Sequence, residues 1–85
     1  MENVKEQSTE NRVLRIFARS FQKDISILSR DTRLEEDLHA KSLNYIGLIA
    51  LLGSEFNTEL SYAVMMRCKR IGDFIDVLES ESKQA

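Results

Sequence analysis

Histidine and cysteine, the side chains most often used for acid–base, nucleophilic and metal chemistry near neutral pH, are scarce in this sequence. The chain of 85 residues contains one histidine, His39, and one cysteine, Cys68. A metal site or a catalytic dyad needs several such groups at a characteristic spacing, and none is visible here. We therefore interpret His39 as an ordinary loop residue, and we expect no metal site and no catalytic residues.

Ser42 is the hydroxyl whose position is most informative, because it stands at the start of a segment with a helical pattern. Serine is a favoured N-cap residue, and most serines at a helix start have only that role. From the residue type alone, Ser42 is predicted to be the N-cap of this helix.

The residues around Ser42 change this interpretation. Residues 31–43 read Asp-Thr-Arg-Leu-Glu-Glu-Asp-Leu-His-Ala-Lys-Ser-Leu. This segment resembles the one before the modified serine of acyl carrier proteins, whose usual pattern is Glu-Asp-Leu-Gly-Ala-Asp-Ser-Leu. The resemblance covers residues 8–80 and continues at the following positions: Leu48, Leu52, Glu55, Phe56, Glu59, Leu60, Ile71, Ile75 and Asp76.

The resemblance implies a carrier domain over residues 8–80, between a polar N-terminal lead (1–7) and a short C-terminal tail (81–85). It implies that 4′-phosphopantetheine is attached covalently to Ser42 by a separate phosphopantetheinyl transferase. The thiol of the arm would hold an acyl thioester for acyl-loading and acyl-accepting enzymes, and the carrier would not be an enzyme. A phosphodiester at a helix N-terminus is electrostatically favourable. A monomer in the cytoplasm is expected.

Several positions depart from the family pattern. The usual glycine and aspartate before the serine are His39 and Lys41, so Lys41 leaves open which transferase acts. Cys68 replaces an aliphatic core residue, which predicts a buried, inert thiol. Helix two usually carries acids that partner enzymes recognise, but here it keeps one charge, Glu55, and the matching positions are otherwise cationic or neutral: Lys41, Asn44, Gly47, Gly53 and Ser54.

Residues 46–52 are all apolar or glycine. A helix that is apolar all round cannot be fully covered in a small bundle, so a strip should face solvent. Leu43, Ile46 and Ala50 lie on one helix face. We expect partners to bind there, beside Lys41 and Gly47. The glycines at 47 and 53 either relieve crowding or allow a partner to approach closely.

The absence of proline and the apolar periodicity predict an all-α fold. It is a small bundle of three main helices and one short helix, with a long loop between the first and second helices. Helices are expected from residue 8 or 9 to 21 or 22, 42–57, 61–66 and 71–80. Residues 23–41 are predicted to be a non-helical loop whose apolar residues lie across the core, namely Ile25, Ile27, Leu28, Leu34 and Leu38.

The overall composition fits one small domain, with 42% hydrophobic and 31% charged residues and a net charge of −2. No apolar segment is long enough to span a membrane. No basic cluster is interleaved with aromatic residues, which argues against nucleic-acid binding. Cys68 alone cannot form an internal disulfide, which suits a reducing compartment.

Two alternatives stay open from the sequence. A peptidyl or aminoacyl carrier domain would use the same serine with a different cargo. An unmodified helical adaptor would keep the fold and bind partners through its apolar second helix, and Lys41 with the missing acids favours that alternative. The acyl group and the pathway are not encoded in any residue pattern, although the altered second helix favours a specialised pathway.

Overall fold

The computed structural model describes residues 8–82, so the predicted lead (1–7) and the last three residues of the predicted tail lie outside the described part. The elements are α2 (Thr9–Phe21), a 3₁₀ turn η1 (Ile25–Ile27), α3 (Leu34–Leu38), α4 (Ser42–Phe56), α5 (Tyr62–Met65) and α6 (Ile71–Ser82). The predicted all-α bundle of three main helices is confirmed. The last helix ends two residues later than expected.

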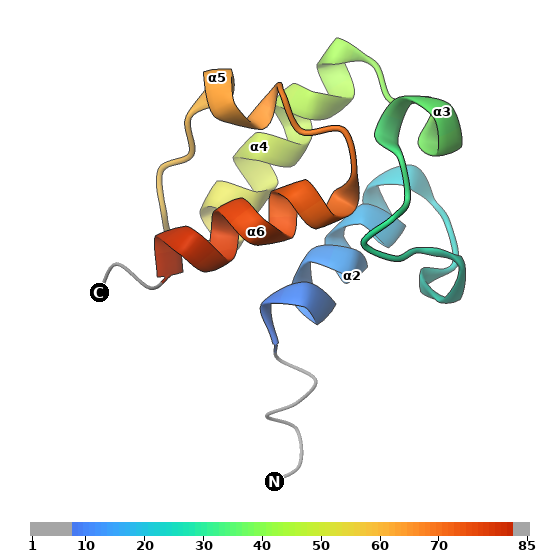
Figure 1. Ribbon diagram of the computed structural model, residues 1–85, viewed down its shortest axis with the longest axis horizontal. Helices are drawn as coiled ribbons and strands as arrows, with labels where there is room; N and C mark the ends of the chain where they lie inside the picture. Colours follow the sequence, from blue (N-terminus) through green and yellow to red (C-terminus); the bar gives the residue numbers. More distant parts are fainter. Residues whose placement is uncertain (1–7, 83–85) are drawn as a thin grey trace, which may run out of the picture.

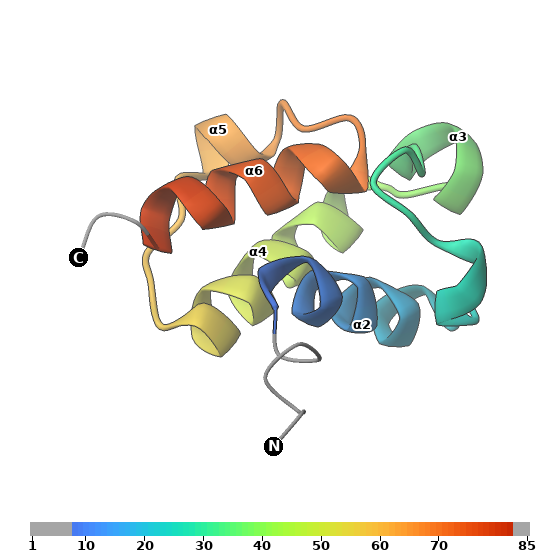
Figure 2. The ribbon, with the colours of Figure 1, turned by 60° about the horizontal axis from the view of Figure 1, so that its bottom comes forward.

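The three long helices enclose one core (Figure 1). Helix α2 packs against both α4 and α6, and the short α5 packs against α4. Turning the molecule shows α6 lying above α2 and α4, with α3 at the far end beside the start of α6 (Figure 2). The N-terminal end of α4 therefore lies at the same end of the bundle as α3.

Local sequence signals determine where the helices begin and end. Ser8 caps α2, its Oγ accepting a hydrogen bond from the Asn11 N–H at 3.2 Å. Gln22 and Asn57 end α2 and α4 in the left-handed conformation, with φ of 55° and 53°. Their N–H groups donate to carbonyls of the last helical turn, which is the usual way of satisfying these groups.

The prediction that residues 23–41 contain no helix is wrong, because η1 and α3 lie within them. Helix α3 forms because Leu34 and Leu38 are one turn apart and both are buried, while the Asp37 carboxylate accepts the Arg33 N–H at 2.8 Å. This hydrogen bond and the Arg33 guanidinium lower the pKa of Asp37. The turn is therefore stabilised by local hydrogen bonding as well as by burial.

The loop covers the core only in part. Leu28, Leu34 and Leu38 are buried as expected, whereas Ile25 and Ile27 are 38% and 66% exposed. The 3₁₀ turn, capped by Asp24 Oδ1 at 2.9 Å from the Ser26 N–H, carries these two side chains outward. The middle of the loop, where α3 begins, is bound to the segment just before α6, since the Leu34 N–H donates to the Lys69 carbonyl at 2.9 Å.

Aromatic rings link the three long helices in the core. The Phe17 ring of α2 meets the Phe74 ring of α6 edge-on, with centroids 5.3 Å apart, and Phe74 lies 6.2 Å from Tyr45 of α4. Phe17 and Phe74 are fully buried. These contacts fix the inner face of α4. Within residues 8–82, no helix is long and apolar enough to cross a membrane.

The two glycines of α4 differ in their surroundings. A Cβ at Gly47 would meet no atom within 4 Å, whereas one at Gly53 would lie 3.0 Å from the Thr58 carbonyl oxygen. Crowding therefore accounts for Gly53 but not for Gly47.

Gly47→Ala should raise the free energy of unfolding by about 0.5–1 kcal/mol through helix propensity. Gly53→Ala should give no gain or a loss. Urea denaturation followed by circular dichroism measures both, and a destabilised Gly47→Ala would contradict the structure.

Candidate functional site

Ser42 is the first residue of α4, and the N-cap position is occupied by Lys41. The prediction that Ser42 is the cap is therefore wrong by one residue. The helix start is secured instead by Asn44, whose Oδ1 accepts the Lys41 N–H at 2.7 Å. Ser42 is exposed, and among the described residues its hydroxyl takes part in no hydrogen bond. The hydroxyl is consequently available for chemistry without disturbing the helix.

The helix start also presents unpaired backbone donors. The first backbone hydrogen bonds of α4 are donated by the N–H groups of Asn44 and Tyr45. Both are accepted by the Lys41 carbonyl, at 2.9 and 3.2 Å. In residues 8–82, the N–H groups of Ser42 and Leu43 have no acceptor. These groups and the positive end of the helix dipole favour an anion bound to the Ser42 oxygen.

Ser42 borders an open hollow of about 510 Å³ between α3, α4 and the segment that connects α5 to α6. Lys41 and Leu43, the chain neighbours of Ser42, also line it. The hollow also includes Met66 and Lys69, which sequence reasoning did not place at the site. In the sequence, Lys69 is flanked by Arg67 and Arg70. Lys69 and Arg70 together line a neighbouring hollow, whereas Arg67 lines another one near Cys68.

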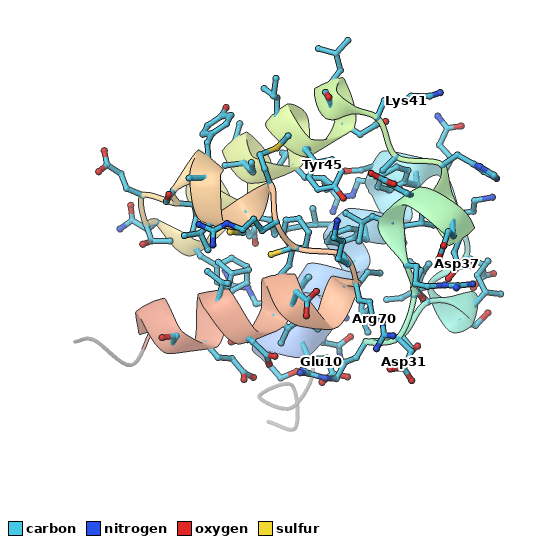
Figure 3. The ribbon with its side chains drawn as sticks, turned by 45° about the horizontal axis from the view of Figure 1, so that its top comes forward. Glu10, Asp31, Asp37, Lys41, Tyr45 and Arg70 are labelled. Atoms are coloured by element: carbon cyan, nitrogen blue, oxygen red, sulfur yellow. The ribbon has the colours of Figure 1, made fainter. Side chains whose placement is uncertain are left out.

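Tyr45 forms the inner wall of the hollow. Figure 3 shows Tyr45 on the inner side of α4, whereas Lys41 extends outward from the start of the helix. The Tyr45 hydroxyl donates a hydrogen bond to the Cys68 carbonyl at 3.2 Å, and burial raises the pKa of this phenol. The buried phenol therefore ties α4 to the connection between α5 and α6. Tyr45 thus both packs in the core and borders the hollow.

Cys68 is buried, as predicted. Burial, with the nearby carboxylates of Asp73 and Asp76, raises the pKa of its thiol to about 11. Since the thiolate is the reactive form, Cys68 is unsuited to nucleophilic chemistry near neutral pH. No group of three or more metal-ligating side chains occurs in the described part of the chain.

His39 ends α3 with φ of 57°, in the left-handed conformation. Glycine adopts this conformation without steric cost, which accounts for the glycine in the family pattern. Histidine is one of the non-glycine residues that are enriched there. His39 is exposed, so a conformational role explains this position without any chemistry of the imidazole.

The predicted strip on α4 is exposed. Leu43 is 80% and Ile46 is 43% exposed, and Ala50 and Gly47 also face solvent. Leu51, which was not predicted, adds to this apolar surface at 52% exposure. The acid of α4, Glu55, is bound by Arg12 of α2. The Arg12 guanidinium donates to the Glu55 carbonyl at 2.8 Å and lies 3.4 Å from its carboxylate.

A small helical bundle with an exposed serine at the start of its second long helix is the architecture of a carrier domain. Comparison with known proteins agrees. Residues 11–78 match the family model described as "Phosphopantetheine attachment site". The acyl carrier proteins of Shigella flexneri and Shigella dysenteriae are each 31% identical over 74 residues, which is 87% of this chain and 95% of theirs. The chain belongs to the acyl carrier protein family, whose cofactor is covalently attached 4′-phosphopantetheine.

The cap position predicts a stabilising substitution. In Lys41→Asp, the carboxylate would accept N–H groups of the first turn and would lie at the positive end of the helix dipole. We expect the free energy of unfolding to rise by about 1 kcal/mol. Lys41→Ala is the matched control, because it removes the ammonium from the same position without adding a hydrogen-bond acceptor. Equal stability changes in the two variants, measured by urea denaturation, would argue against the capping explanation.

Proposed function

We propose that this protein is an acyl carrier protein that holds an acyl group as a thioester on a phosphopantetheine arm attached to Ser42. The observation that supports it most strongly is the free hydroxyl of Ser42 at the N-terminus of α4, inside the region matched by the family model. Attachment forms a phosphodiester between the arm and the Ser42 oxygen, with the unpaired N–H groups nearby. The phosphoanhydride of coenzyme A breaks, adenosine 3′,5′-bisphosphate leaves, and the transferase takes the hydroxyl proton. The proposed pathway is a specialised one of the fatty-acid, lipid or polyketide type.

The proposed carrier is not an enzyme. A phosphopantetheinyl transferase supplies the activation of the hydroxyl, and acyl-loading and acyl-accepting enzymes act on the thioester. The high pKa of the Cys68 thiol supports this division, since it keeps the chain's own cysteine from competing with the arm for acyl groups. A reduced, buried cysteine also fits the proposed cytoplasmic location.

We propose that partner enzymes bind the exposed strip of Leu43, Ile46 and Ala50, with Lys41 and Gly47 at its borders. The support is the exposure of these apolar side chains in a helix whose acid is already paired with Arg12. Contiguous exposed apolar surface commonly marks an interaction site. Gly47 fits this role because the space above its backbone is open. The open space allows a partner to approach α4 closely.

The proposal of a specialised pathway is supported by the same helix surface. In relatives that carry acids on helix two, basic patches of the enzymes recognise the carrier, and α4 lacks most of the acids that such recognition needs. A peptidyl or aminoacyl carrier remains the alternative cargo assignment, and the intact mass of the loaded protein distinguishes the two. A monomer is proposed for the free carrier.

The attachment site is tested with the full-length chain, coenzyme A and several transferases. Intact-protein mass should increase by one phosphopantetheinyl group in the wild type and in Ser54→Ala, which alters another exposed serine of α4. Ser42→Ala should show no increase. It should also unfold at the same urea concentration as the wild type, because Ser42 caps nothing and alanine is a good helix former. Failure of every transferase, with native protein also unmodified, would favour the adaptor.

The apolar strip is tested with the transferase that modifies the protein. Ile46→Ala should lower kcat/KM for modification roughly ten-fold, since truncating an apolar side chain at an interface centre costs about 1–2 kcal/mol. Ile27→Ala is the control, because Ile27 is more exposed but lies on η1. The loss in Ile46→Ala should be similar at low and moderate salt, because apolar burial is not screened. Equal effects of the two substitutions would contradict the proposed strip.

A further inference from the structure

A groove runs between α2 and α4, on the side of α4 that is turned toward α2. It consists of two hollows of about 220 Å³ each, which share Ser20 and Leu51 and are therefore contiguous. One hollow reaches Leu43 near the start of α4, and the other reaches Glu55 near its end. The groove thus follows most of the length of α4, and it does not include Ser42.

The two walls of the groove have different chemistry. The α2 wall carries Arg12, Arg15 and Arg19, which are spaced three and four residues apart and so occupy one helix face. The α4 wall is apolar, because the Leu51 side chain on it is 52% exposed. At Gly47 no side chain projects from this wall, so the space above the backbone is open. A basic wall beside an apolar wall is an amphipathic surface.

The charge of the basic wall is only partly compensated. Arg12 is held by Glu55 and lies over the Phe56 ring, 4.2 Å from its centroid. Arg15 and Arg19 are exposed and, within residues 8–82, pair with no carboxylate. Glu10, also on α2, instead pairs with Arg30 at 3.8 Å. Two guanidinium groups one helical turn apart are therefore available to a ligand.

We propose that the groove between α2 and α4 binds an acidic amphipathic helix of a partner protein. Two carboxylates one turn apart on such a helix match the spacing of Arg15 and Arg19, and each guanidinium can bind a carboxylate with two hydrogen bonds. Apolar residues on the adjacent face of the helix would cover Leu51 and the open space at Gly47. The groove shares Leu43 and Gly47 with the proposed strip, but the inference goes beyond the proposed carrier function, because no step of it involves Ser42 or the arm.

The charge distribution favours a local acidic helix over an extended polyanion. The chain has a net charge of −2, and α6 exposes Asp76 and Glu79. A nucleic acid or an anionic membrane would interact with the field of the whole molecule, which is not attractive. A single helix lying in the groove meets the arginines of α2, the apolar wall and Glu55, whose carboxylate is paired with Arg12, and it stays away from the acids of α6.

The test uses a designed helical peptide that carries two glutamates one turn apart beside a row of leucines. A matched peptide has both glutamates replaced by glutamine. The peptides are titrated into the full-length, ¹⁵N-labelled protein. We expect the acidic peptide to shift amide resonances of α2 and α4 around Arg15, Arg19 and Leu51. The double variant Arg15→Gln/Arg19→Gln should bind it at least five-fold more weakly at low salt. This difference should disappear near 1 M salt, where the Debye length is about 3 Å.

Two controls give each outcome a clear meaning. Lys23→Gln removes one exposed positive charge just beyond α2, outside the groove, and should bind the acidic peptide like the wild type. Ser42→Ala should also bind like the wild type, so a failure of the carrier proposal does not affect this one. Equal binding of both peptides, or shifts confined to other elements, would overturn the proposal. Arginine-dependent binding to phosphatidylglycerol vesicles without peptide binding would replace it with a membrane surface.

Discussion

Helix α4 is apolar on nearly all sides, yet within residues 8–82 only two other long helices, α2 and α6, are available to cover it. Tyr45, Leu48, Ile49 and Leu52 face the core and are buried. The remaining apolar side chains must face solvent, and Leu43, Ile46 and Leu51 are 80%, 43% and 52% exposed. Exposed apolar area in water is unfavourable, so it is best explained by partners that cover it. The positions of the two proposed binding surfaces follow from this one imbalance.

The charged groups around α4 also favour partners that bind apolar surface, because none of them provides a free acid on this helix. Its acid, Glu55, is bound by Arg12, and the arginines of α2 flank one side of the helix while Lys41 and Lys69 stand at its start. Partners that depend on a row of acids along this helix find no free one within it. The proposed recognition therefore relies on apolar burial and on cationic groups, which is the reverse of the pattern in relatives with acidic helices.

The sequence predicted the long helices because apolar periodicity reports burial directly. Val13, Ile16 and Phe17 recur at helical spacing and are all buried. It missed α3, because a single turn of helix has no period to detect and depends on the Asp37–Arg33 hydrogen bond. It also missed Met66 and Lys69 at the hollow, since only the packing of α5 against α4 brings them to Ser42. Long-range neighbours of this kind leave no local signal.

The cap of α4 connects the departures from the family pattern to the proposed chemistry. Most caps of this kind accept hydrogen bonds from the first turn, but the Lys41 ammonium cannot accept one, and it adds positive charge to the positive end of the helix dipole. The unmodified protein therefore holds an unfavourable charge arrangement at this point. A phosphodiester on Ser42 would place a negative charge beside both the cation and the unpaired N–H groups. In the proposed carrier, attachment of the arm would thus relieve a conflict that an aspartate at position 41 would never create.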